Sequence, residues 1–354
     1  MTTDSALVAG AGGVIGRSVV EHLAREGVQT RGASRRTPQG SPTWEHLPAD
    51  LSDPDKAREG LRAAADTTRL VFAAYIERDD LEAQIAPNLA LLDNTLKGLA
   101  AAGAPLQHVT LYQGHKFYGS HLGAFKTPAK ESDPRLIGPN FYYDQEDLLR
   151  ERAQEMGFRF TIFRPEAVLG YAQGTPMNLL MAIATYVAIT KELGLPLRFP
   201  GALQAYDGIF YQMTDAELLA RATDWAATAS GAANETFNIT NGDVIRWSHL
   251  WRALAEHYGL PLEEPKSIRL EQHMPPQGHI WRRIVAKHGL VDTPYTDLVD
   301  WRFGDLILNS TWDNVSSTVK LRQAGFHDSH DTEQRLLDLL DDLGERRIIP
   351  PAHT

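Results

Sequence analysis

A tyrosine and a lysine in the first half of the chain carry the polar groups best suited to stabilise negative charge on a reacting oxygen. Tyr142 opens a predicted helix over 140–157, and Lys116 follows a predicted strand that ends at Tyr112. The residue four positions after Tyr142, on the same helical face, is Glu146 rather than a lysine. Taken alone, Lys116 also fits a surface loop and Tyr142 a packed aromatic, so their pairing depends on the elements that position them.

Glycines at 10, 13 and 16 lie between a predicted apolar strand over 6–9 and a predicted amphipathic helix over 14–24. Glycines at this spacing let the backbone turn sharply, approach a pyrophosphate and direct helix N-terminal amides at its charge. A tight turn without a ligand is the alternative, but the strand before it and the helix after it favour a dinucleotide-binding turn. The predicted binding residues are Gly10, Gly12, Gly13, Val14, Ile15 and Gly16.

Two arginines after the second predicted strand, over 30–34, indicate which dinucleotide is bound. Ser34, Arg35 and Arg36 stand where an NAD-specific protein usually places an acid on the ribose 2′-hydroxyl. Guanidinium groups there favour a 2′-phosphate, so we expect NADP(H), with a solvated surface pair as the alternative. After the next strand-like segment, Asp50 is expected near the adenine amino group and Leu51 against the adenine ring.

Strand and helix signals alternate through the first half, as in successive βαβ units. They predict an α/β fold, a doubly wound Rossmann sheet of parallel strands with a smaller, mainly helical C-terminal substrate-binding lobe. We expect residues 1–170, with 202–245 contributing, to form the NADP-binding domain, and 171–201 with 246–354 to form the lobe. Further strands are predicted at 70–75, 109–112 and 160–163, and further helices at 89–102 and near 332–343.

Composition excludes several classes of function. The net charge of −10 would repel phosphate backbones, so nucleic acid is not an expected partner. The absence of cysteine excludes disulfides, thiolate zinc sites and a thiol nucleophile, and fits a reducing cytoplasm. No histidine pair has a metal-ligand spacing on a helix. The start of the chain lacks a signal-peptide pattern, and the apolar stretch over 177–189 is too short to span a membrane, so no membrane partner is expected.

A series of motifs occurs along nearly the whole chain. In chain order, it comprises the glycine turn, Arg35-Arg36, 50–53, 88–94, the Gly-x-Lys-x-Tyr element at 114–118, Asn140-Phe141-Tyr142-Tyr143 with Glu146-Asp147, Arg164-Pro165, Gly170, 177–179, 214–218, 237–243, Trp247, Trp251 and 301–305. In this series the sequence resembles the progesterone 5β-reductase and iridoid synthase-like family of extended short-chain dehydrogenases/reductases, known from plants and with bacterial relatives. Ordinary short-chain reductases instead carry a lysine four residues after the tyrosine.

The resemblance implies that Tyr142 and Lys116 are catalytic. They would act on the carbonyl oxygen of an enone while hydride from NADPH attacks the β-carbon, and they would stabilise the enolate. Relatives often have tryptophan on the substrate side of the fourth strand, where this chain has Tyr75, and the spacing after Lys116 also differs. Candidates for the substrate pocket are Tyr75, Phe125, Asn178 and Phe303.

Two other functions fit parts of the same pattern. An extended short-chain carbonyl reductase, or a sugar-nucleotide epimerase or dehydratase, would use the same cofactor fold, although Glu146 in place of lysine argues against it. A non-catalytic NADP-sensing regulator would keep the glycine turn and the arginines without needing Tyr142 and Lys116. The expected partner is a small-molecule enone, and the expected assembly is a monomer or homodimer.

Overall fold

The computed structural model describes residues 4–38 and 42–353, which form two compact units. The first unit comprises the chain up to Glu166 together with Ala216–Ile239 and Ser316–Asp328; the second comprises Ala167–Asp215, Thr240–Val315 and the chain from Ser329. The first unit thus takes 216–239 from the expected contribution of 202–245, and adds 316–328. The segment 216–239 belongs to the first unit because its strand β9 (Glu235–Ile239) pairs with β6. The segment 316–328 belongs to it because its helix α13 (Val319–Gln323) packs on β9.

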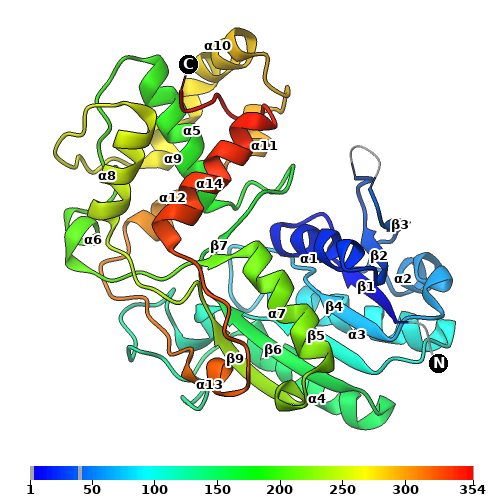
Figure 1. The fold of residues 1–354 in the computed structure, drawn as a ribbon. Helices are drawn as coiled ribbons and strands as arrows, with labels where there is room; N and C mark the ends of the chain where they lie inside the picture. The colour runs from blue at the N-terminus through cyan, green and yellow to red at the C-terminus, as the bar shows by residue number, and fades with distance from the viewer. Residues whose placement is uncertain (1–3, 39–41, 354) are drawn as a thin grey trace. The chain divides into compact units, whose positions relative to one another are not determined.

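The first unit is built on a seven-stranded parallel sheet in the order β3-β2-β1-β4-β5-β6-β9 (Figure 1). With its flanking helices, this sheet confirms the predicted Rossmann architecture. The remaining strands are β1 (Ser5–Ala9), β2 (Gln29–Ser34), β3 (Glu45–Pro48), β4 (Arg69–Phe72), β5 (His108–Tyr112) and β6 (Arg159–Pro165). The helices are α1 (Val14–Arg25), α2 (Pro54–Gly60), α3 (Ile85–Ala102), α4 (Phe141–Met156) and α7 (Ala216–Thr228), with 3-10 turns η1 (Arg62–Ala64), η2 (His115–Tyr118) and η3 (Ser230–Ala232).

The core strands are apolar along most of their length because helices cover them. Every residue of β1 and β5 is buried, as expected for parallel strands shielded on both faces. The helix α1 packs against α7, and α3 packs against α2 and α4. The predicted fourth strand was wrong at its end: β4 stops at Phe72, and Tyr75 lies in the following loop. The ladder with β5 ends at the pair Phe72 and Leu111, after which the chain leaves the sheet.

The second unit is mainly helical around its own apolar core. Its most buried helix, α5 (Leu179–Glu192), contains most of the apolar stretch over 177–189. Within the described residues, no helix is both long and apolar enough to cross a membrane. The other elements are β7 (Val168–Leu169), β8 (Thr214–Asp215), α6 (Leu203–Gly208), α8 (Trp247–Tyr258), α9 (Leu270–His273), η4 (Pro275–Gln277), α10 (Gly278–His288), α11 (Tyr295–Leu298), α12 (Trp301–Leu308) and α14 (Thr332–Glu345).

Candidate active site and family

The glycine turn has the close backbone packing that its spacing predicts. Gly10 has a left-handed φ of +84°, and a Cβ there would lie 2.7 Å from the backbone of Ala73. A Cβ on Gly16 would lie 2.2 Å from the carbonyl oxygen of Gly10, so α1 can approach the turn only without a side chain at this position. The helix begins at Val14 with no acidic residue in its first turn, so nothing there opposes a bound anion. The turn therefore fits a pyrophosphate.

The basic pair lies at the carboxyl end of β2, beside a histidine that the sequence analysis missed. Arg35 and Arg36 are both exposed. The Ser34 hydroxyl donates to the carbonyl oxygen of Arg36 at 2.8 Å and lies 3.0 Å from Nε2 of His46 on β3. His46 could have been found only from the pairing of β2 with β3, which brings it beside Ser34. The arrangement offers positive charge at the place where the Rossmann fold presents the ribose of a dinucleotide.

Asp50 and Leu51 follow β3 at the same edge of the sheet. The pKa of Asp50 is lowered mainly because the side chain of Ser52 donates a hydrogen bond to it, at 2.6 Å, and Arg35 contributes as a nearby positive charge. Leu51 is buried, and its carbonyl oxygen accepts a hydrogen bond from Asn94 on α3 at 3.0 Å. The loop is thus held by α3 while Asp50 stays charged next to Arg35.

Neutralising the basic pair tests the cofactor assignment. We expect Arg35→Ala with Arg36→Ala to raise the Kd for NADPH by about 10-fold or more and to change that for NADH by less than about threefold, because only NADPH carries the 2′-phosphate. Titration of cofactor fluorescence measures both constants. As a control, Arg58→Ala removes an exposed arginine that pairs with Asp55 on α2. Equal weakening of both cofactors by the double variant would contradict the assignment.

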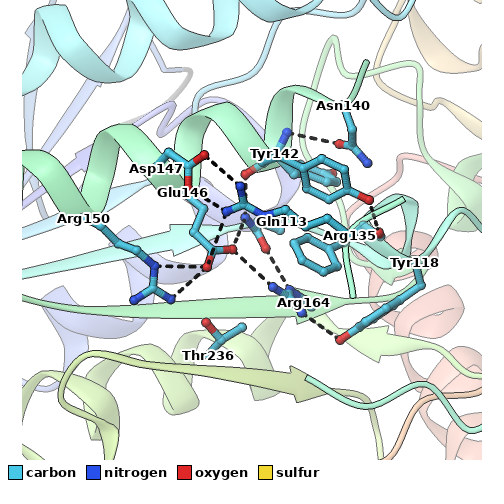
Figure 2. A network of polar contacts seen from close by, with 12 residues as sticks. Gln113, Tyr118, Arg135, Asn140, Tyr142, Glu146, Asp147, Arg150, Arg164 and Thr236 are labelled. Carbon is cyan, nitrogen blue, oxygen red and sulfur yellow. Dashed lines mark hydrogen bonds and ion pairs between the residues drawn. The ribbon is translucent and has the colours of Figure 1, made fainter. Parts of the chain in front are cut away.

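Tyr142 is positioned by the cap of α4. The side chain of Asn140 accepts from the backbone N–H of Tyr142 at 3.1 Å and donates to the carbonyl oxygen of Lys116 at 2.8 Å. The Tyr142 hydroxyl lies 3.2 Å from where a Cβ would stand on Gly114, two residues before Lys116. One asparagine therefore links the helix that carries the tyrosine to the turn that carries the lysine, as Figure 2 shows for its contact with Tyr142.

The ionisation of Tyr142 is set by its surroundings. Burial raises the pKa of its phenol, and the nearby carboxylates of Glu166 and Glu77 raise it further. The phenol is therefore protonated at neutral pH and available as a hydrogen-bond donor.

Lys116 lies beside an acidic residue that the sequence analysis did not single out. Its ammonium nitrogen is 3.9 Å from Oε2 of Glu77. The same oxygen accepts a hydrogen bond from the Tyr75 hydroxyl, and Oε1 of Glu77 accepts one from the side chain of Gln84 at 2.9 Å. Burial and the Glu77 carboxylate raise the pKa of Tyr75, so this phenol is also neutral. One feature of the sequence could have identified Glu77: it is an acidic residue in the loop after the fourth strand, and Lys116 follows the neighbouring strand at the same carboxyl edge of the sheet.

Of the four pocket candidates, Tyr75 and Phe125 lie in the first unit, and Asn178 and Phe303 in the second. Tyr75 stacks on Phe141 with ring centroids 5.5 Å apart, next to Tyr142 in the chain, and Phe125 stacks on Tyr118 at 6.5 Å. The side chain of Asn178 caps α5 and donates to the carbonyl oxygen of Gly170 at 2.8 Å. Phe303 packs against the core of the second unit. Tyr75 and Phe125 are thus the two candidates placed with Tyr142 and Lys116 in one unit.

Comparison with known proteins identifies the family. A model of the PRISE-like Rossmann-fold domain matches residues 51–297. The chain belongs to this family. It is 31% identical to the (S)-8-oxocitronellyl enol synthase ISY1 of Nepeta racemosa, covering 98% of this chain and 93% of that protein. It is 30% identical to the 3-oxo-Δ4,5-steroid 5β-reductase of Arabidopsis thaliana, covering 98% and 92%.

Solved structures confirm the fold of this PRISE-like protein. The UDP-glucose 4-epimerase of Thermotoga maritima superposes with a TM-score of 0.67 at 16% identity, over 96% of this chain and 99% of the epimerase. The corresponding enzyme of Thermus thermophilus gives 0.63 at 18% identity, over 95% and 98%. At such identities the likeness establishes a shared extended Rossmann architecture and says nothing about chemistry.

Proposed function

We propose that this PRISE-like protein is an NADPH-dependent reductase that adds hydride to the C=C bond of an α,β-unsaturated carbonyl compound. Two relatives support this proposal by name: a reductase of a 3-oxo-Δ4,5-steroid, and an enol synthase, which forms an enol as its product. The glycine turn and the arginines at 35 and 36 fit NADPH. When bound, NADPH supplies the hydride.

The observation that carries the proposal is the neutral phenol of Tyr142, linked through Asn140 to the turn of Lys116. During hydride addition to an enone, negative charge grows on the carbonyl oxygen. The Tyr142 hydroxyl and the Lys116 ammonium would donate hydrogen bonds to that oxygen and stabilise the enolate more than the ground state. Protonation of the α-carbon by solvent completes the reduction.

Reduction of the carbonyl itself is the second candidate, and the position four residues after Tyr142 argues against it. A lysine there would lower the pKa of the phenol, whereas Glu146 accepts hydrogen bonds from Arg150 at 2.8 Å and from Arg164 at 3.2 Å. Here burial and the carboxylates of Glu166 and Glu77 raise the pKa of the phenol instead, which suits a group that donates a hydrogen bond and keeps its proton. An enolate oxygen, whose charge is delocalised, needs donors rather than a transferred proton, while an alkoxide must be protonated.

A product assay separates the two reactions. The protein and NADPH are incubated separately with 2-cyclohexenone, with an acyclic enal and with cyclohexanone, and the products are identified by mass spectrometry. We expect the two unsaturated probes to yield saturated carbonyl compounds and cyclohexanone to remain unchanged. Allylic alcohols or cyclohexanol would overturn the proposal in favour of carbonyl reduction. NADPH binding without turnover of any probe would favour a regulator.

A further inference from the structure

We propose that Arg164 is a positioning residue for the reaction, whose buried guanidinium sets the placement of Tyr142 and Lys116. Arg164 lies on β6 and is 2% exposed. Its guanidinium donates its hydrogen bonds to Gln113, Tyr118 and Glu146 rather than to the two proposed catalytic groups, so it would act through the segments that carry them. This inference rests on the proposed function for its kinetic test, but one readout below does not depend on turnover.

The guanidinium of Arg164 uses all three of its nitrogens in the interior (Figure 2). Its Nε donates to Oε1 of Gln113 at 2.8 Å, its Nη1 to the hydroxyl of Tyr118 at 3.0 Å, and its Nη2 to Oε2 of Glu146 at 3.2 Å. Its central carbon also lies 3.2 Å from the centre of the Phe117 ring. A planar fork of fixed geometry can hold three partners in one arrangement, which a lysine cannot do.

Two of these partners lead to Tyr142. Glu146 lies one turn after Tyr142 on α4, so the ion pair fixes the first turns of that helix against β6. The side-chain amide of Gln113 donates to the main-chain carbonyl oxygen of Tyr142 at 2.9 Å. Gln113 comes directly after β5, so the tyrosine is held against the carboxyl ends of two neighbouring strands.

The other partners lead to Lys116. Phe117 and Tyr118 follow Lys116 in the same 3-10 turn, η2. The Tyr118 hydroxyl, which accepts from Arg164, donates in turn to Oδ1 of Asn238 on β9 at 2.5 Å. The carbonyl oxygen of Phe117 accepts from the hydroxyl of Tyr143 on α4 at 2.7 Å. One guanidinium thus joins the turn of the lysine to the helix of the tyrosine.

Two carboxylates of α4, those of Glu146 and Asp147, compensate part of the positive charge near Arg164. One carboxylate oxygen of Glu146 faces Arg164, and the other faces Arg150, which is partly in solvent. Arg135 pairs with Asp147 through two hydrogen bonds of 2.7 Å. A buried ion pair surrounded by satisfied hydrogen bonds favours one arrangement of the chain over its alternatives, a role known for some buried polar networks. In the proposed reaction, that arrangement would hold the two donors that face the reacting oxygen.

The decisive experiment measures coupling between Arg164 and Tyr142. Arg164→Lys keeps the charge but loses the fork, and we expect it to lower kcat by about 10- to 100-fold, since misplacing reacting groups by about 1 Å can cost that much. The KM for NADPH should change by less than about twofold. In a Tyr142→Phe background the same substitution should lower kcat by a clearly smaller factor, because Lys116 is then the only donor left for Arg164 to position. Equal factors in both backgrounds would overturn the inference.

A second variant covers the case in which Arg164→Lys fails to fold. Gln113→Met removes the hydrogen bond to Tyr142 but leaves the Arg164–Glu146 ion pair in place, and it should show the same coupling to Tyr142→Phe. The matched control is Arg31→Lys. Arg31 is also a buried arginine, and it forms ion pairs with Glu45 at 2.8 Å and with Asp66. It lies on β2, which β1, β4 and β5 separate from β6 in the sheet. This substitution should leave kcat unchanged in both backgrounds, whatever it does to Tm.

A spectroscopic readout separates this inference from the proposed function. In protein labelled with 13C at tyrosine Cζ, the Tyr142 signal is assigned by its loss in Tyr142→Phe. We expect Arg164→Lys or Gln113→Met to shift that signal and Arg31→Lys to leave it in place. An unmoved signal in both folded variants would overturn the positioning role. A wild-type protein that reduces no enone, but whose Tyr142 signal responds, would overturn the proposed function alone.

Discussion

Replacing Tyr142 by phenylalanine is expected to lower kcat for enone reduction by about 10²- to 10³-fold, or about 2.7–4 kcal/mol, while the Kd for NADPH stays within about twofold. The reason is that the variant keeps the ring and its packing but loses one donor to the charge that develops on the substrate oxygen. Lys116→Met should cause a loss of the same order. Single-turnover oxidation of NADPH, followed by absorbance, measures the rate of the chemical step.

Tyr112→Phe is the matched control for this experiment. Tyr112 is a buried tyrosine on β5 in the same unit, and its hydroxyl bonds the side chain of Thr223 at 2.5 Å. Its loss should cost about 1 kcal/mol of stability and leave kcat unchanged. Full activity in both Tyr142→Phe and Lys116→Met would show that neither residue takes part in the reaction.

Gly16→Ala is expected to weaken NADPH binding by about 10²-fold or more and to lower Tm by several degrees. A helical alanine is favoured over glycine by about 1 kcal/mol, which alone would stabilise α1. The added Cβ, however, would lie 2.2 Å from the carbonyl oxygen of Gly10, and because the contacted atoms are backbone, only a shift of the helix or the turn can relieve the contact. Such overpacking costs about 1–3 kcal/mol and moves the amides that face the pyrophosphate.

The control for this substitution lies in the same turn. At Gly12 an added Cβ would meet only the Cβ of Ser34, at 3.9 Å. Gly12→Ala should therefore leave Tm unchanged within about a degree. Differential scanning fluorimetry and cofactor titration of the two variants give both quantities. A Gly16→Ala protein as stable as the Gly12→Ala protein would contradict the packing argument.

The elements that local pattern determines were predicted well from the sequence. The predicted strands at 6–9, 30–34 and 109–112 each lie within an observed strand, and the predicted helix at 14–24 lies within α1. The strand at 6–9 is a buried apolar run that ends at Gly10, and the helix at 14–24 has the amphipathic period of a helix that packs on one face. The predicted strand at 70–75 extends too far because residues 73–75 are as apolar as β4 before them. The strand ends where the pairing of β4 with β5 ends, and this the sequence does not show.

The polar surroundings of the candidate site could not be predicted in the same way. Glu77 lies in a loop that no motif marked, whereas Arg164 and Asn238 belong to the motif series, which assigned them no role and places them on two different strands. Their roles depend on the order of strands in the sheet, which brings β6 between β5 and β9. For Glu146 the sequence indicated only that the usual lysine is missing. The structure shows the reason in physical terms: this carboxylate is the partner of a buried guanidinium.

The first unit returns to its sheet after long excursions, and this limits how the protein can be dissected. A fragment ending at Glu166 would lack β9, so the hydrogen-bonding groups that β6 offers to Glu235–Ile239 would be open to pairing with another chain. It would also lack Asn238, which accepts a hydrogen bond from the Tyr118 hydroxyl that itself accepts from Arg164. Chimaeras that exchange the second unit between relatives must therefore graft 167–215 and 240–315 as inserts, attach the segment from Ser329 after the host's last segment, and keep 216–239 and 316–328 with the host.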